Sequence, residues 1–162
     1  MKNTKAITKS AIIAAIYVVI TLIASLFGLS SGAIQVRFSE ALTVLPYFTP
    51  AAVPGLFVGC IISNIISGCL LWDIVFGSLA TLIGAIGTYF LRKKSIWFAP
   101  IPPIVANTVI IPYVLKNVYQ LKEAVSYFFV TVFIGELVSC GVLGLLLSML
   151  LKRRKDLVDI IK

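Results

Sequence analysis

The chain of 162 residues is 60% hydrophobic and 12% charged, and its mean hydropathy is +1.08. Soluble domains are about half apolar and about a quarter charged, so this composition indicates an integral membrane protein. The net charge of +8 comes from basic residues gathered at the ends of apolar segments, which argues against nucleic acid as a partner.

The lengths of the apolar segments indicate the fold class. They are far longer than the roughly 9–11 alternating residues of a membrane β-strand. We therefore expect an all-α integral membrane protein. Residues 1–162 form one expected transmembrane domain with helices at about 7–29, 37–48, 53–71, 74–91, 96–115 and 124–151.

The first segment, 7–29, follows three lysines and in this respect resembles a signal peptide. Its apolar run of about 20 residues is long enough to span a bilayer, so we expect it to remain as a helix. Small residues recur in it at four-residue spacing, as Ser10/Ala14 and Ala11/Ala15. Such spacing allows another helix to approach closely, either inside the bundle or on a partner protein.

The second segment begins at Arg37, after a Ser/Gly-rich loop, and is too short to cross about 30 Å of hydrocarbon. Arg37 and Glu40 stand three residues apart, so on a helix they share a face and can pair. Pro46, Pro50 and Pro54 interrupt the apolar residues that follow. We expect the chain to reverse there partly within the membrane, shielded by neighbouring helices.

The later segments carry small residues, prolines and isolated polar groups. Trp72 and Asp73 form a very short expected connection between the third and fourth segments. Prolines make the start of the fifth segment irregular, and Pro112 is expected to end it. Close packing against a neighbouring helix is expected in the fourth segment, from small residues at Gly77, Ser78, Gly84 and Gly87.

An even number of segments places both termini on the same side of the membrane. If that side is the cytoplasm, eleven of the fourteen basic residues are cytoplasmic, and Arg37, Lys116 and Lys122 are outside. Because basic loops stay in the cytoplasm, this asymmetry predicts cytoplasmic N- and C-termini in the plasma membrane.

Several polar side chains then fall in the outer half of the bilayer. Glu136 is the deepest, and an acid at the centre of a membrane helix costs about 2.5–3.5 kcal/mol on the insertion scale. The alternative is that each polar group is simply paired with a neighbour in the chain. Glu40 would then pair with Arg37, and Asp73 would cap a helix. A pocket open to the outside explains the set better, and its candidate substrate-binding residues are Arg37, Glu40, Asn64, Trp72, Asp73, Asn107, Tyr113 and Glu136.

Such a pocket suits a small planar molecule that is rich in hydrogen-bond donors. One carboxylate can accept two parallel hydrogen bonds from an amidine-like ring edge, and a second can meet an ammonium group. Asparagine offers both a donor and an acceptor to a lactam edge. Trp72 and Tyr113 are expected to supply flat apolar walls.

Motifs for catalysis and cofactor binding are missing from the sequence. It has no histidine, no nucleophile elbow and no P-loop, so we expect a binding protein that is not an enzyme and that depends on an ATPase elsewhere. Cys60, Cys69 and Cys140 lie in apolar surroundings without CxxC spacing. We therefore expect neither a metal site nor a cofactor nor a disulfide framework.

Two stretches carry a family resemblance that extends over nearly the whole chain. They are IQVRFSEALTVLPYFTPAAVPGLFVGCIISN and LWDIVFGSLATLIGA. Both resemble the QueT family, whose members are substrate-binding S components of energy-coupling factor (ECF) transporters. The resemblance implies a bundle of six transmembrane helices with N-in/C-in topology. It also implies a queuosine precursor as the substrate, namely a 7-deazaguanine such as the aminomethylated base.

The same resemblance implies partners for this chain. Ala11 and Ala15 match the small-residue motif with which S components dock the transmembrane coupling subunit (EcfT type), and two cytoplasmic ATPases drive that subunit. The loop at 29–35 matches the position of the family's substrate gate. Two alternatives stay open: the same architecture for another vitamin-like ligand, and an autonomous proton-linked carrier in which Glu136 and Asp73 exchange protons.

Overall fold

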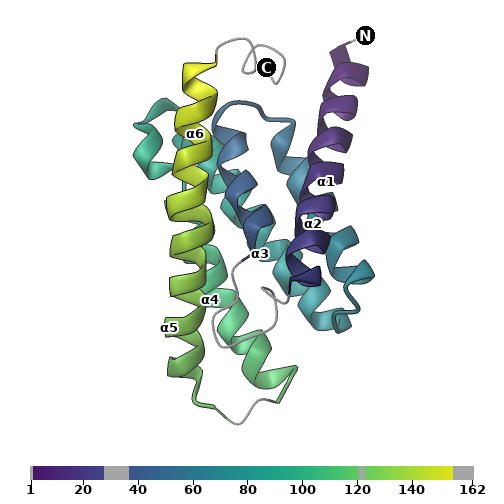
Figure 1. Cartoon of the computed structure of the whole chain (residues 1–162), viewed down its shortest axis with the longest axis vertical. Coiled ribbons are helices and arrows are strands. Elements are labelled where there is room, and N and C mark those ends of the chain that lie inside the picture. Colours follow the sequence, from purple (N-terminus) through teal and green to yellow (C-terminus); the bar gives the residue numbers. More distant parts are fainter. Residues whose placement is uncertain (1, 28–36, 121–122, 155–162) are drawn as a thin grey trace.

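The computed structural model describes residues 2–27, 37–120 and 123–154. Every regular element in these ranges is helical (Figure 1), which confirms the all-helical prediction. Two central helices, η1 (Phe38–Tyr47) and α2 (Ala52–Ile66), are too short to be spans by themselves. Four stretches are long and apolar enough to cross a membrane, namely Thr4–Leu26, Leu71–Lys93, Ile96–Asn117 and Val125–Arg153.

The helices form one bundle around η1 (Figure 1). The first turns of α1 (Lys2–Leu26) lie at the same end of the molecule as the last turns of α6 (Gly144–Arg153). α3 (Leu71–Phe90) packs against α4 (Ile101–Asn117). The 3₁₀ turns η2 (Leu91–Lys93) and η3 (Ile96–Phe98) connect these two helices. The last part of the chain is one continuous helical rod that comprises α5 (Val125–Glu136), the π-helical segment η4 (Leu137–Leu143) and α6.

Apolar side chains cover the outside of the bundle, and polar side chains are turned inward. Ile83, Val105 and Leu146 are each about half exposed, whereas Glu40, Asp73 and other polar residues are buried. This distribution reverses that of a soluble protein, because lipid solvates apolar groups and penalises unsatisfied polar ones. The burial pattern therefore agrees with a membrane location for the four long stretches.

The second segment lies in the centre of the molecule. η1 is a 3₁₀ helix of ten residues, of which all but the first and the last are buried. It contacts α1, α2, α3, η4 and α6. Because the hydrogen-bond geometry of 3₁₀ helices is poor, runs of this length are uncommon and need support from their surroundings. Its first turn carries Glu40 into the interior of the bundle.

Glycines allow α3 and α4 to pack with their backbones close together. A Cβ atom added at Gly84 would lie 2.6 Å from the Cα atom of Pro103, and one at Gly87 would lie 2.5 Å from the Cβ atom of Pro102. Both distances are shorter than any normal contact, so only glycine fits at these positions. The prediction of close packing from the small residues of this segment is confirmed at Gly84 and Gly87.

Two expectations about helix boundaries in this region are wrong. α2 ends before Gly68, which adopts a left-handed conformation (φ +72°), and the amide of Cys69 donates to the carbonyl of Asn64. This is the glycine-dependent C-terminal motif of helices, which the surrounding apolar run conceals. The connection therefore comes earlier than predicted, and Trp72 and Asp73 lie in the first turn of α3.

The fifth segment also differs from its expected bounds. It starts with the turn η3 and becomes α-helical at Ile101, so that Pro102 and Pro103 occupy the first turn, where a missing amide hydrogen is tolerated. Pro112 does not end the helix, because α4 continues through it to Asn117. Neighbouring helices can stabilise a proline within a membrane helix.

We predict that Gly84→Ala destabilises the bundle. The new methyl group would force α3 away from Pro103, and overpacking of this kind typically costs about 1–3 kcal/mol. Gly141→Ala is a matched control, because its nearest contact would be 3.4 Å from the movable side chain of Leu137. Thermal unfolding in detergent should show a lower Tm for Gly84→Ala than for Gly141→Ala. Equal Tm values would contradict the packing argument.

Candidate functional site

Two carboxyl groups from distant parts of the chain meet inside the bundle. Glu40, on η1, is 1% exposed, and Glu136, at the end of α5, is 8% exposed. A carboxylate oxygen of each and the Sγ atom of Cys140 lie within 4.8 Å of one another. Two buried acids at this separation are costly unless hydrogen-bond donors or a cation compensate them. They are the chemical centre of the candidate site.

Hydroxyl groups from two other helices fix one side of the Glu40 carboxylate. Tyr17 Oη, on α1, donates to Glu40 Oε1 at 2.5 Å, and Thr81 Oγ1, on α3, lies 3.4 Å from the same oxygen. The other carboxylate oxygen, Oε2, is buried and has no hydrogen-bond partner among the described residues. The carboxylate is thus held at one oxygen and left unsatisfied at the other.

A π-helical turn places Cys140 beside both acids. Its thiol lies 3.1 Å from Glu136 Oε2 and 3.3 Å from the backbone carbonyl of Glu40, and either oxygen can accept its single S–H hydrogen. Thr43 Oγ1 lies 3.3 Å from the same sulfur. The segment η4 starts directly after Glu136, and π-helical turns within α-helices are frequent at functional sites.

Asn107 completes this central cluster from α4. Its amide interacts with the carboxyl groups of both Glu40 and Glu136. The side chain is 4% exposed, yet its Nδ2 atom makes no hydrogen bond within the described part of the chain. The structure therefore brings together three of the predicted site residues, from η1, α4 and α5.

A second polar cluster surrounds Asp73. Tyr119 Oη donates to Asp73 Oδ2 at 2.8 Å, and the positive charge of Arg37 attracts both Asp73 and Glu40. Partial burial and the hydrogen bond to Asp73 raise the pKa of Tyr119 above its ordinary value. Asp73 is not the N-cap of α3, as the alternative for this residue supposed, because Leu70 occupies that position.

Asn64 and Cys60 connect the two clusters. Asn64 Nδ2 lies 3.6 Å from Cys60 Sγ, and Thr81 Oγ1 lies 3.5 Å from the same sulfur and 3.4 Å from Glu40 Oε1. Asn64 Nδ2 and Asp73 Oδ1 both border the space above Gly77, at 3.4 and 3.7 Å from a Cβ atom built there. A chain of polar contacts therefore runs from Glu40 through Thr81 and Cys60 to Asn64, and Asp73 borders the same space above Gly77.

A cavity opens beside this chain of contacts. Its volume is about 660 Å³, within the usual range of roughly 300–1,000 Å³ for small-molecule sites. Arg37, Ser39 and Asn64 border it, so it reaches the residue next to Glu40. Its other lining residues belong to the end of α1 and to the end of α2, namely Thr21, Leu22, Ala24, Ser25, Leu26, Ile66, Ser67 and Cys69.

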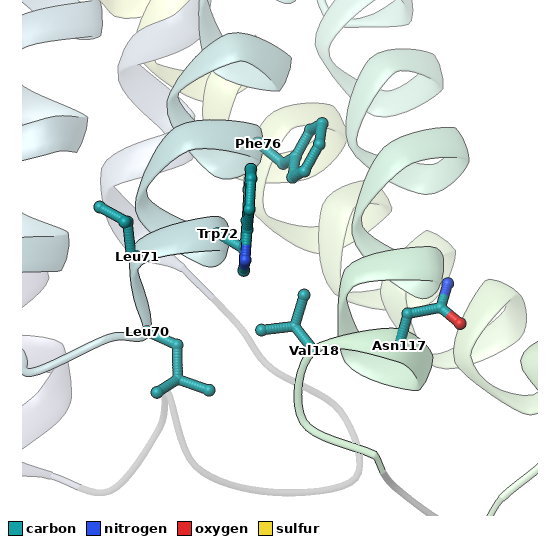
Figure 2. A pocket seen from close by; sticks show the side chains of 6 residues that line it. All are labelled: Leu70, Leu71, Trp72, Phe76, Asn117 and Val118. Atoms are coloured by element: carbon teal, nitrogen blue, oxygen red, sulfur yellow. The ribbon is translucent and has the colours of Figure 1, made fainter.

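Trp72 and Tyr113 lie away from these clusters. Trp72 is 56% exposed and stacks on Phe76, with 6.0 Å between ring centroids, at a separate cavity of about 640 Å³ (Figure 2). Tyr113 is 53% exposed and packs edge-on against Phe129. Adjacent residues on a helix point about 100° apart, so Trp72 faces outward while Asp73 faces inward.

Besides Cys140, four polar contributors were missed by the sequence analysis. Tyr17, Thr81 and Tyr119 donate to acids of the site, and Cys60 interacts with two polar side chains instead of packing only as a small hydrophobe. One signal was available for Tyr17. A tyrosine inside an apolar helix needs a partner for its hydroxyl group, so it points toward a polar site.

The central cluster also has the donor types of a metal site. Two carboxylates and a thiol within 4.8 Å could hold an ion. Each of the three residues, however, already takes part in a hydrogen bond, with Glu136 and Cys140 bonded to each other and Glu40 bonded to Tyr17.

The two pairs of small residues on α1 have different surroundings. Ser10 and Ala14 face α2, where Ser10 Oγ donates to the carbonyl of Ala51 at 2.8 Å and Ala14 lies against Gly59. Ala11 and Ala15 are exposed on the opposite side of the helix. The first pair therefore serves internal packing, and the second is open to a partner.

Comparison with known proteins identifies the family. The model of the family described as "QueT transporter" matches residues 7–153. A relative named "Queuosine precursor transporter QueT", from Lactococcus lactis subsp. cremoris (strain MG1363), is 38% identical over 85 residues, which are 51% of this chain and 50% of the relative. The match thus spans about half the length of that relative. No solved structure is significantly similar. Because the family model covers most of the chain, the protein belongs to the QueT transporter family, a family of transporters and not of enzymes.

Proposed function

We infer that the chain is the substrate-binding subunit, or S component, of an ECF-type ABC transporter that imports a queuosine precursor. The substrate is a 7-deazaguanine such as the aminomethylated base. Membership of the QueT transporter family and the name of the Lactococcus relative support this inference. The observation that carries it is the buried pair formed by Glu40 and Glu136.

The acid pair matches a ligand that is both cationic and rich in donors. Two carboxylates in a bilayer need compensation. The described residues give them hydroxyl and thiol donors, and the Asn107 amide and the positive charge of Arg37 also interact with them. The aminomethylated base carries an ammonium group and a ring edge with several N–H groups, so it offers what the cluster lacks. Arg37 and Asn64 belong to the proposed site because they line its cavity, and Asp73 belongs to it because it interacts electrostatically with Arg37.

The proposed topology has six membrane-embedded segments and cytoplasmic termini in the plasma membrane. Lys5 and Lys9 lie in the first turns of α1, and Lys152 and Arg153 in the last turn of α6, at the same end of the bundle (Figure 1). A concentration of basic residues at one end favours a cytoplasmic location of that end. Two of the six segments are η1 and α2, each of which is too short to span the membrane alone.

The proposed partners are a transmembrane coupling subunit of the EcfT type and two cytoplasmic ATPases. The chain has no P-loop of its own, so a transport cycle driven by ATP needs other subunits. Ala11 and Ala15 form an exposed small-residue surface on α1, which suits close contact with a helix of the coupling subunit.

The substrate assignment predicts binding of 7-deazaguanines by the purified chain. Mass spectrometry should find such a base in the purified protein, and titration calorimetry should show that Glu40→Gln, Asp73→Asn and Glu136→Gln each weaken binding at least about tenfold. A hydrogen bond to a charged group contributes about 1.5–3 kcal/mol, which is the basis of this expectation. Glu123→Gln, at an exposed position outside the clusters, is the matched control. A folded wild-type chain that binds no 7-deazaguanine would refute the assignment.

The proposed docking surface predicts a separation of binding from transport. Ala11→Trp or Ala15→Trp should leave ligand affinity unchanged, abolish uptake and prevent co-purification of the coupling subunit. Val105→Trp, on the exposed side of α4, controls for the general effect of a large side chain. Co-purification of the ATPases at the wild-type level with both alanine variants would contradict the docking role.

The alternative of a proton-linked carrier makes the opposite prediction for transport. In it, Glu136 and Asp73 exchange protons, and no partner is required. Liposomes that contain only this chain should show no uptake of the base under a pH gradient if the S-component proposal is correct. Uptake under these conditions, without an ATPase, would overturn the S-component proposal in favour of the carrier.

A further inference from the structure

Two buried atoms of the central cluster lack the hydrogen bonds that their chemistry requires. Glu40 Oε2 is an acceptor and Asn107 Nδ2 is a donor, and neither has a partner among the described residues, although both side chains are more than nine-tenths buried. Nearly all buried polar atoms in native proteins are hydrogen-bonded. An unsatisfied acceptor and an unsatisfied donor in the same cluster therefore point to a ligand with the complementary pair.

The surrounding contacts keep these two atoms available. Tyr17 and Thr81 engage Glu40 at Oε1, which leaves Oε2 on the other side of the carboxylate. Asn107 lies near the carboxyl groups of both Glu40 and Glu136, but no hydrogen bond of normal geometry joins its Nδ2 atom to a described residue. Donor and acceptor are held by α1, η1, α3 and α4, so their relative position is set by the packing of the bundle.

We propose that Glu40, Asn107 and Glu136 read three neighbouring groups on one side of the ligand. Glu40 Oε2 accepts from the ring N–H, Asn107 Nδ2 donates to the adjacent ring carbonyl, and Glu136 meets the cationic arm. In the aminomethylated 7-deazaguanine the carbonyl lies between the ring N–H and the arm. Asn107 interacts with both acids, so we assign to it the carbonyl that lies between the groups assigned to Glu40 and Glu136.

This inference rests on the proposed function and adds a specificity rule to it. The site should select a lactam edge, in which an N–H stands next to a carbonyl. In a diamino analogue, an amine replaces the carbonyl and the ring nitrogen becomes an acceptor. The acceptor nitrogen would then face the acceptor Glu40 Oε2, and the donor amine would face the donor Asn107 Nδ2. Sites that hydrogen-bond a polar group reject analogues that leave buried groups unpaired.

Calorimetry with two ligands that carry the same aminomethyl arm tests the rule. The wild-type chain should bind the lactam at least about 100-fold more tightly than the 2,6-diamino analogue. The double exchange Glu40→Gln with Asn107→Asp keeps the net charge and nearly the same volume, but reverses donor and acceptor. It should reverse the preference between the two ligands.

A single variant and a control variant complete the experiment. If the double variant binds neither ligand, Asn107→Asp alone should still lower the wild-type preference at least about tenfold. Ser148→Ala removes a buried hydroxyl that, among the described residues, donates to the carbonyl of Gly144 on its own helix. It is the control and should leave the preference unchanged.

An unchanged preference in Asn107→Asp or in the double variant overturns the specificity rule, as does a wild-type chain that binds both ligands equally. Both of these results leave the proposed function standing, because the chain still binds a 7-deazaguanine. Failure of the folded wild-type chain to bind either ligand removes the proposed function itself.

Discussion

The burial of two carboxyl groups in a small helical bundle is the constraint on which the remaining structure depends. An acid in hydrocarbon requires partners in fixed positions, and for Glu40 those partners come from helices that are far apart in the sequence. Tyr17, Thr81 and Cys140 supply them from α1, α3 and the last helical rod. The register of each of these helices against η1 is therefore tied to the position of Glu40.

Close helix packing makes this arrangement possible. In a bilayer, burial of apolar surface between helices contributes little, because lipid is as apolar as the helix surface, so association depends on close contact and hydrogen bonds. Gly55 and Gly59 bring α2 against α1, while Gly84 and Gly87 bring α3 against the prolines at the start of α4. Polar atoms that these contacts place in the interior can then reach one another.

The sequence allowed the helical class, the inward polar residues and the close packing at Gly84 and Gly87 to be predicted, because each depends on local composition or spacing. It did not reveal which polar residues meet. Glu40 and Glu136 are brought together by the mutual packing of distant helices, which no local pattern encodes. Gly68 was missed as a helix end because it stands in an apolar run, and this error placed Asp73 in a connection. Trp72 was expected in the pocket because an aromatic ring can supply a flat apolar wall, and its outward direction depends on the position at which α3 begins.

Tyr17 and Ala15 stand two residues apart on α1, one facing Glu40 inside the bundle and the other facing outward. An α-helix is stiff over so short a distance, so these two positions move as a single body. The outer surface of α1 and the hydrogen bond from Tyr17 to Glu40 are consequently coupled through the rigid helix. A rotation of α1 that changes what its outer side touches also displaces the hydroxyl group that orients the acid.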